Sequence, residues 1–359
     1  GTEMVLTLEN SDYFLQYAYL KNRRDYYFTA FQNADFFNIG YDVYTGLYTT
    51  ARLRHYGIQF LVSNPFNRYN RIDLGFSWHN ISYSILRPMI TGSGYNYNEV
   101  RYEEVDNQSF STILPTLSWV YDNSVFGFTG PIDGFRQNTS LTFSPGYGTD
   151  SLNFQTMKID ARKYWRFGRD YTLAVRTFIG KSFGPDKQKF FMGGIPYMLA
   201  GGGETNGKKD TGQYRDVLLD TSNTSLIQDI YFTEYAFPIR GARFAERFGS
   251  NALLANIEMR FPFINYLALG FPLKVIFGNI RGHAFLDIGA AYDDGEYSKD
   301  NWPYEYGAPK YKYSPWVATL GVGTKINLGY FLLRIEAAWD KNPNGYSKPQ
   351  WYFSLGPDW

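Results

Sequence analysis

Several residue types are missing or scarce in this sequence. Cysteine is absent from its 359 residues, and histidine occurs three times, at His55, His79 and His283. The absence of cysteine excludes disulfides, thiolate zinc sites and cysteine nucleophiles, and so few histidines leave little material for imidazole chemistry. Charged residues make up 19% of the chain, below the roughly 25% of soluble globular proteins, with 35 basic against 34 acidic side chains. That balance provides no basic surface for gripping nucleic acid.

Long apolar runs are missing too. A membrane-spanning helix needs about 18 consecutive apolar residues, whereas the best stretches here, such as Leu269 to Phe277, are short and broken by Gly and Pro. The N-terminus carries no secretory signal, so we expect Gly1 to be a cut end. Aromatic residues are abundant, with 32 Tyr, 30 Phe and 8 Trp, although the mean hydropathy is −0.36. A chain with so many large apolar side chains is not disordered.

Apolar and polar residues alternate with a period of two along much of the chain, which is typical of β-strands. In the stretch 253–261 one face is apolar, and the other carries Asn256, Glu258 and Arg260. The stretches 157–162 and 331–340 alternate in the same way, with their charges on one side. A soluble sandwich would bury the apolar face, whereas a membrane barrel would turn it to lipid and its charges to the lumen. Alternation alone leaves both folds open.

Strand length, turn asymmetry and aromatic placement favour the barrel. Transmembrane strands need about 9 to 11 residues, with short turns on one side, longer loops on the other and aromatic residues at both ends. Tight turns at 21–25, 65–70, 166–170 and 328–330 alternate with mostly long connections at 35–51, 88–108, 184–251, 293–314 and 341–349. We therefore predict an all-β, antiparallel transmembrane β-barrel with about fourteen strands in this chain, near residues 3–9, 13–20, 26–34, 52–64, 71–87, 109–122, 138–148, 152–165, 171–183, 252–264, 272–292, 315–327, 331–340 and 350–359.

The C-terminal stretch has the features of a closing strand. An open sheet edge in hydrocarbon leaves N–H and C=O groups unpaired, so the first and last strands are expected to pair. Proline cannot donate a ladder hydrogen bond, so pairing near the C-terminus should be weak and the seam between these strands able to open. The outward face of the stretch ends on an aromatic residue, which resembles the insertion signal of outer-membrane barrels, and it consists of Trp351, Phe353, Leu355, Pro357 and Trp359.

Four motifs resemble one family. The first is Phe190-Phe191-Met192-Gly193-Gly194, and the second is Phe237-Pro238-Ile239-Arg240-Gly241-Ala242-Arg243-Phe244. The third is Phe285-Leu286-Asp287-Ile288-Gly289, and the fourth is Glu258 on the charged face of its strand. Together they resemble the BamA/TamA superfamily of outer-membrane assembly and translocation barrels, the bacterial surface antigen type, over nearly the whole chain.

The resemblance implies a barrel of sixteen strands whose long sixth loop, at 184–251, folds into the lumen. The aromatic-x-Gly-Gly motif leads into this loop, and its tip carries Ile239, Arg240 and Gly241. Arg240 is expected between Asp287 and Glu258, because two carboxylates match the donors of a guanidinium. An alternative remains that these residues form an ion pair that only stabilises the barrel.

Smaller details of the tip also follow from the resemblance. Gly241 is expected to let the backbone approach the wall, and Gly289 to leave room opposite. Phe285 and Asp287 share a face of the same strand. Ala242 stands where the family has an aromatic residue, a contact that Phe244 is expected to supply.

Counting strands from these motifs predicts that the chain begins at the third strand. Strands one and two and any periplasmic domains are then expected upstream, and residues 1–359 form a single barrel domain. The segments Asn64-Pro65-Phe66-Asn67-Arg68 and Gly130-Pro131-Ile132-Asp133-Gly134 look closest to the subgroup whose barrel follows a TolB-like β-propeller.

The resemblance implies a protein of the bacterial outer membrane that assists insertion or export of client proteins through a weak seam. Expected partners are the bilayer, lipopolysaccharide, unfolded client proteins and accessory periplasmic or lipoprotein subunits, with no nucleic acid, cofactor, metal or catalytic residue. Alternatives are a gated or plugged pore, or a membrane anchor of an upstream enzymatic domain. His79 beside Asn80 is interpreted as part of the wall and not as a hydrolase histidine, because no serine is marked out at a matching position.

Overall fold

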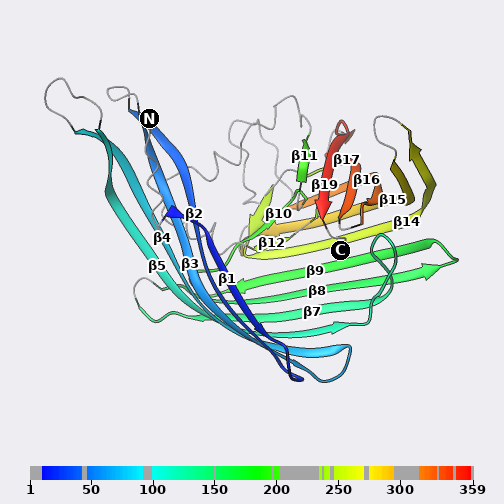
Figure 1. The fold of residues 1–359 in the computed structure, drawn as a ribbon, viewed down its shortest axis with the longest axis horizontal. Coiled ribbons are helices and arrows are strands. Elements are labelled where there is room, and N and C mark those ends of the chain that lie inside the picture. The colour runs from blue at the N-terminus through cyan, green and yellow to red at the C-terminus, as the bar shows by residue number, and fades with distance from the viewer. Residues whose placement is uncertain are drawn as a thin grey trace.

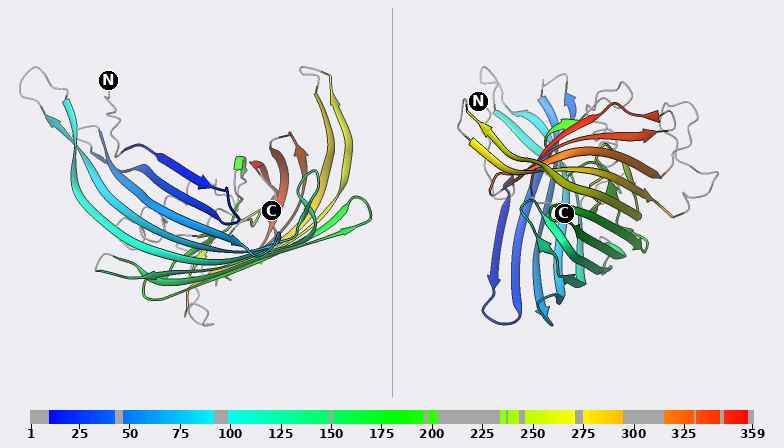
Figure 2. Two further views of the ribbon diagram at one scale, coloured as in Figure 1. Left: turned by 60° about the horizontal axis from the view of Figure 1, so that its bottom comes forward. Right: turned by 90° about the vertical axis from the view of Figure 1, so that its right-hand side faces the viewer.

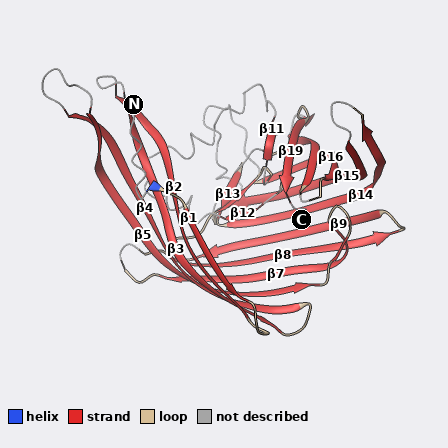
Figure 3. Cartoon of the chain, viewed as in Figure 1, coloured by secondary structure: helices blue, strands red, loops and turns tan. Residues whose placement is uncertain are grey.

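The structure is a computed structural model that describes residues 10–42, 47–91, 99–148, 151–195, 198–202, 234–236, 238–242, 246–270, 275–294, 315–329, 331–342 and 345–356. In these ranges the chain forms β-strands and no α-helix, with only a short 3₁₀ turn at Asn10, drawn in blue in Figure 3, and this confirms the predicted all-β class. Within the described ranges there is no helix of the length and apolarity needed to cross a membrane.

Most strands belong to one large curved sheet (Figure 1). With two short additions, β6 (Val125–Phe126) beside β7 and β18 (Gly345–Tyr346) beside β17, it is 16-stranded, and neighbours are antiparallel throughout, as predicted. In spatial order its main strands are β1 (Tyr13–Tyr19), β2 (Asp25–Asp42), β3 (Leu47–Pro65), β4 (Asn70–Thr91), β5 (Glu99–Asp122), β7 (Pro131–Pro145), β8 (Asn153–Phe167), β9 (Tyr171–Phe183), β14 (Asn251–Leu269), β15 (Val275–Tyr292), β16 (Trp316–Asn327), β17 (Leu332–Asn342), β19 (Gln350–Gly356) and β11 (Met198–Gly202).

The two faces of the sheet differ as the alternation predicts. In β9, Ala174, Arg176 and Phe178 are buried inside the curve, whereas Ile179 and Phe183 point the other way and are exposed. Other strands expose apolar side chains on the same outer face, among them Leu74, Phe76, Trp119, Leu141 and Trp351. Such an outer surface suits lipid, and the charged inner surface suits a lumen.

Two of the predicted loops are wrong. The sequence predicts loops at 35–51 and 88–108, but β2 and β3 pair from Asp25 to Asp42, and β4 and β5 pair from Asn70 to Thr91. These stretches are rich in Asn, Asp, Tyr and Gly, which indicates loops when a segment is judged alone. Pairing with a neighbouring strand satisfies the backbone regardless of that composition, so the hairpins extend further.

The two ends of the described sheet do not meet, so the expected pairing of the first and last strands stays a prediction (Figure 2). Among the described strands, β1 pairs only with β2, and the outer edge of β19 pairs with β11 from the long loop. A loop strand therefore occupies the edge that the first strand was expected to take. The predicted strand at 3–9, together with Pro357 and Trp359, lies outside the described residues.

The turn between β5 and β7 reaches across to the opposite side of the curve. The Pro131 carbonyl accepts a hydrogen bond from Arg260 Nη1 at 2.7 Å, and the Phe128 carbonyl accepts one from Asn327 Nδ2 at 2.5 Å. Arg260 belongs to β14 and Asn327 to β16. The turn thus braces the middle of the sheet against its C-terminal part.

A second, 3-stranded sheet lies in the long loop and is formed by β12 (Glu234–Ala236), β10 (Phe190–Met192) and β13 (Arg247–Gly249). Phe190 and Met192 are buried against the wall, where Phe190 meets Phe178 of β9. Figure 1 shows β10 and β12 on the concave side of the large sheet. This packing fixes the 3-stranded part of the loop inside the curve, whereas β11 of the same loop belongs to the large sheet.

Candidate functional site

A short backbone bridge joins the start of the long loop to its tip. Gly193 and Gly194 adopt positive φ values of 118° and 84°, which glycine tolerates because it has no Cβ. Gly194 and Ile239 then exchange two backbone hydrogen bonds, at 3.1 and 3.0 Å. The aromatic-x-Gly-Gly motif therefore holds the tip, residues 238–242, directly by backbone contacts.

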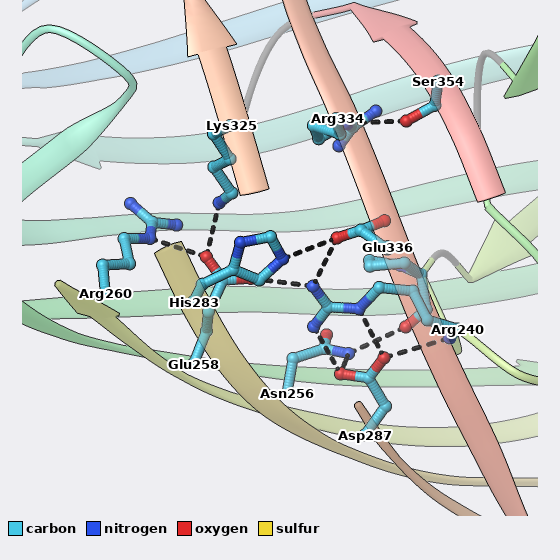
Figure 4. A network of polar contacts seen from close by, with 11 residues as sticks. Arg240, Asn256, Glu258, Arg260, His283, Asp287, Lys325, Arg334, Glu336 and Ser354 are labelled. Atoms are coloured by element: carbon cyan, nitrogen blue, oxygen red, sulfur yellow. Dashed lines mark hydrogen bonds and ion pairs between the residues drawn. The ribbon is translucent and has the colours of Figure 1, made fainter. Parts of the chain in front are cut away.

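Arg240 lies at the centre of the site and is 2% exposed (Figure 4). Its Nε and Nη2 donate to the two carboxylate oxygens of Asp287, each at 2.8 Å, and its backbone N–H donates to Asp287 Oδ2 at 3.0 Å. Its Nη1 donates to Glu258 Oε2 at 2.8 Å and to Glu336 Oε1 at 3.1 Å. Burial acts to lower the pKa of Arg240, but Asp287, Glu336 and Glu258 raise it well above its usual value, so the guanidinium stays charged.

Strand register brings the first two carboxylates together. In the β14–β15 ladder Asn256 lies opposite Asp287, and Glu258 lies opposite Phe285, so both acids face the lumen side by side. Asn256 Nδ2 donates to Asp287 Oδ1 at 2.8 Å and to the Pro238 carbonyl at 2.7 Å, which ties the wall to the tip. Period-two alternation alone places these side chains on one face.

Glu258 also has cationic partners within the wall. Arg260 Nε donates to Glu258 Oε1 at 2.7 Å, and Lys325 Nζ donates to the same oxygen. Glu258, Arg260 and Lys325 are all buried. Because an unpaired buried charge is costly, this pairing keeps the wall stable on the side away from Arg240.

Glu336 is a third carboxylate that the motifs did not identify. Besides Arg240, it binds His283 Nε2 at 2.9 Å through the same oxygen. Gly323 lies between His283 and Glu336 in the ladder, and a Cβ there would approach both side chains within 2.8 Å. The sequence signal for Glu336 was the charged face of 331–340. That face does not show that the Glu336 side chain contacts the loop tip.

Phe285, Gly241 and Gly289 shape the space around the tip. The Arg240 guanidinium carbon lies 3.5 Å from the centre of the Phe285 ring, in cation–π geometry. Gly241 has a φ of 93°, and a Cβ there would lie 3.0 Å from Ala338 Cβ. A Cβ on Gly289 would overlap Ile239 and Met192, so this glycine admits the loop. Ile239 itself is fully buried.

The remaining predicted residues lie elsewhere. Trp351, Phe353 and Leu355 alternate with buried residues along β19, and Trp351 is 53% exposed on the outer face. Phe244 and Trp359 lie outside the described residues. His79 lies in the wall, where Nδ1 is 2.9 Å from His55 Nε2 and Nε2 is 2.9 Å from Ser77 Oγ. The structure thus brings a serine to His79, although the sequence singled out none, and Ser77 is buried, at 7% exposure, with its hydroxyl also donating to the Leu114 carbonyl at 3.5 Å.

Replacement of Glu336 by glutamine should destabilise the barrel by about 1.5–3 kcal/mol, because Arg240 and His283 lose a charged acceptor. The urea midpoint of the folded protein in detergent measures the change. The control is Glu234→Gln, whose Lys158 partner is part-exposed and whose pair is worth roughly 0–1 kcal/mol. Equal effects of the two substitutions would show that Glu336 is not part of the tip site.

These contacts define a class of protein: an antiparallel sheet with a lipid-compatible outer face, whose internal loop is ion-paired to the wall through one arginine. The Omp85 superfamily domain matches residues 10–359, and the chain belongs to the Omp85 superfamily. Members of this superfamily are outer-membrane β-barrel proteins, so the predicted family and the outer-membrane location are confirmed. The narrower resemblance to a propeller-bearing subgroup stays a prediction, as does the division into one barrel domain with a loop at 184–251.

Two solved structures resemble the fold. BamA from Haemophilus ducreyi lacking POTRA domains 1-3 is 11% identical, with a TM-score of 0.52 over 93% of this chain and 62% of that chain. CdiB from Acinetobacter baumannii is 12% identical, with a TM-score of 0.50 over 96% of this chain and 49% of that chain. The chain therefore spans less than two thirds of either relative. A comparison with curated proteins gave no match.

Proposed function

We propose that this barrel assembles or translocates other proteins at the outer membrane, without a cofactor. The observation that carries the proposal is a loop tip fixed to β14, β15 and β17 through Arg240, inside a sheet whose ends are not joined. Family membership supports it, because the motifs resemble those of assembly and translocation barrels. Its partners are the bilayer with its lipopolysaccharide, unfolded client proteins and accessory subunits.

The mechanism is physical. Among the described strands β1 pairs with β2 alone, which leaves its other edge available for backbone pairing, and every side chain of β1 is exposed. An extended client segment can add to such an edge by backbone hydrogen bonds, which requires no particular client sequence. The Arg240 contacts fix the loop to β14, β15 and β17, so the ion-paired tip acts as a lock on the C-terminal wall while clients add at the edge of β1.

A photo-crosslinking amino acid at Leu15 of β1 tests this function in cells. Leu15 is 65% exposed, and the matched control is Leu74, which is 55% exposed on the outer face in the middle of the sheet. We expect crosslinks from position 15 to newly made outer-membrane proteins, and few from position 74. Equal capture at both positions, or none, would contradict the proposal.

The pore alternative makes a different prediction. A barrel that only conducts should show steady, selective conductance in planar bilayers and no client crosslinks at position 15. That combination would replace the assembly proposal with a plugged pore.

A further inference from the structure

The outer edge of the last strand is occupied by the protein's own loop. In the β11–β19 ladder Ala200 lies opposite Phe353, and Gly201 lies opposite Tyr352. The other edge of β19 pairs with β17, from Leu332 to Ala338. The C-terminal strand therefore has a neighbour on both sides, although the sheet is open.

The direction of β11 is the direction that a closing strand needs. Thirteen strands run from β1 to β19 in the described sheet, each antiparallel to the next, so β1 and β19 point the same way. Two strands that point the same way cannot form an antiparallel seam, which is why single-chain bacterial outer-membrane barrels have even strand numbers. Because β11 is antiparallel to β19, it is also antiparallel to β1. It lies beside β19 in the orientation that a strand joining β19 to β1 would need.

The pairing of β11 is the weaker of the two that β19 makes. β11 has five residues, two of which are the glycines Gly201 and Gly202, and its register shifts between Met198 and Ala200. Glycine weakens a strand interior because it loses more conformational freedom and packs no side chain. The β17 side has an uninterrupted register along the full length of β19. A neighbour of this kind is suited to being exchanged.

One residue of the last strand is bound by both parts of the loop. The Tyr352 backbone lies opposite Gly201, and the Tyr352 hydroxyl accepts a hydrogen bond from the Gly241 backbone N–H at 3.0 Å. The ring is buried with Ile195, which follows the Gly193-Gly194 segment that bonds the tip. The tip therefore contacts the face of β19, while β11 covers its edge.

We propose that β11 is an exchangeable cap on the edge of β19, and that Tyr352 couples this cap to the seated Arg240 tip. In the capped state the loop strand satisfies the backbone of β19 and excludes any other strand from that edge. Withdrawal of the tip removes the Gly241 contact from Tyr352 and weakens the cap, so the edge becomes open to the strand that closes the wall. The inference concerns the resting protein and does not depend on the proposed client activity.

A disulfide across the ladder tests the cap. The chain has no cysteine, so Ala200→Cys with Phe353→Cys introduces the only thiols. Opposite residues in antiparallel strands lie about 4.5–5.5 Å apart at Cα, within disulfide range. The control is Ala200→Cys with Ile335→Cys, in the same row but one strand further, at roughly 10 Å. We expect ready oxidation of the first pair and not of the second in the folded, membrane-inserted protein.

Adding Tyr352→Phe or Arg240→Ala to the first pair tests the coupling. Tyr352→Phe keeps the ring and loses the hydroxyl, so the oxidation rate should fall by up to about tenfold, the factor that one ordinary hydrogen bond supplies. Arg240→Ala should lower it further. Unchanged rates would overturn the coupling, and a first pair that does not oxidise would overturn the cap while leaving the proposed function in place.

A proline pair gives a measurement without thiols. Successive N–H groups of a strand point to opposite edges, so Ala200→Pro with Gly201→Pro removes one donor that faces β19. Amide exchange at residues 351–354 should then rise, whereas Ala200→Ser with Gly201→Ala should leave it unchanged. Heat-modifiable gel mobility checks that each variant is folded. Equal exchange in the two folded variants would contradict the cap.

Discussion

Replacement of Arg240 by alanine should release the loop tip and destabilise the barrel by ~3–5 kcal/mol, because buried carboxylates lose their shared cation. Asp287 is the acid most affected, since it accepts three hydrogen bonds from Arg240. Ala242→Cys reports on the tip, because Ala242 is 2% exposed and the chain has no other thiol. We expect slow labelling of Ala242→Cys alone, rapid labelling when Arg240→Ala is added, and a lower urea midpoint.

The control for Arg240→Ala is a lumen arginine whose ion pair joins it to the wall and not to residues 238–242. Arg176 of β9 shares Asp160 with Arg162, so Arg176→Ala leaves the acid paired. This substitution should cost less stability and leave the labelling of Ala242→Cys slow. Rapid labelling in both variants would mean that general loosening of the barrel, and not the Arg240 contacts, frees the tip.

Replacement of Gly289 by valine should displace the tip without changing any charge. A Cβ at this position would overlap Ile239 and Met192, and overpacking of this kind costs about 1–3 kcal/mol. The ion pairs of Arg240 with Asp287 and Glu258 then lengthen because the tip backbone moves away from the wall. Faster labelling of Ala242→Cys and a lower urea midpoint are the expected results.

Gly278 of the same strand is the matched control for this steric test. Among the described residues a Cβ there would come no closer than 3.9 Å, to Asn265 O, so valine is expected to fit. Gly278→Val should therefore leave both the labelling rate and the urea midpoint close to those of the parent protein. If Gly289→Val behaved like Gly278→Val, the tip would not depend on close packing against β15.

Much of the wall could be predicted from the sequence because each strand meets lipid on one face and the lumen on the other. Because of that requirement, apolar and polar residues alternate along 253–261, and Glu258 and Arg260 lie on the buried face. Composition was less informative at 35–51 and 88–108, where polar residues form paired strands. A local signal fails there because pairing depends on the neighbouring strand and not on the residues of the segment.

The tip site could be predicted only in part. Motifs predicted a contact of Arg240 with Asp287 and Glu258, and the structure brings these residues together, although their role as a lock remains a proposal. Glu336 was missed because its contact joins the loop to a strand 96 residues further along. The loop strand β11 was missed because a short segment rich in glycine has little strand propensity of its own.

The brace between the β5–β7 turn and strands β14 and β16 has a mechanical consequence. Through Pro131 and Phe128 the turn ties the middle of the sheet to its C-terminal part, so these strands resist bending as one stiff shell. The strands from β1 to β4 lie on the other side of the turn, and β1 is held by β2 alone among the described strands. If the gap between the two ends of the sheet widens, we therefore expect strands β1 to β4 to move and the C-terminal strands to stay nearly in place.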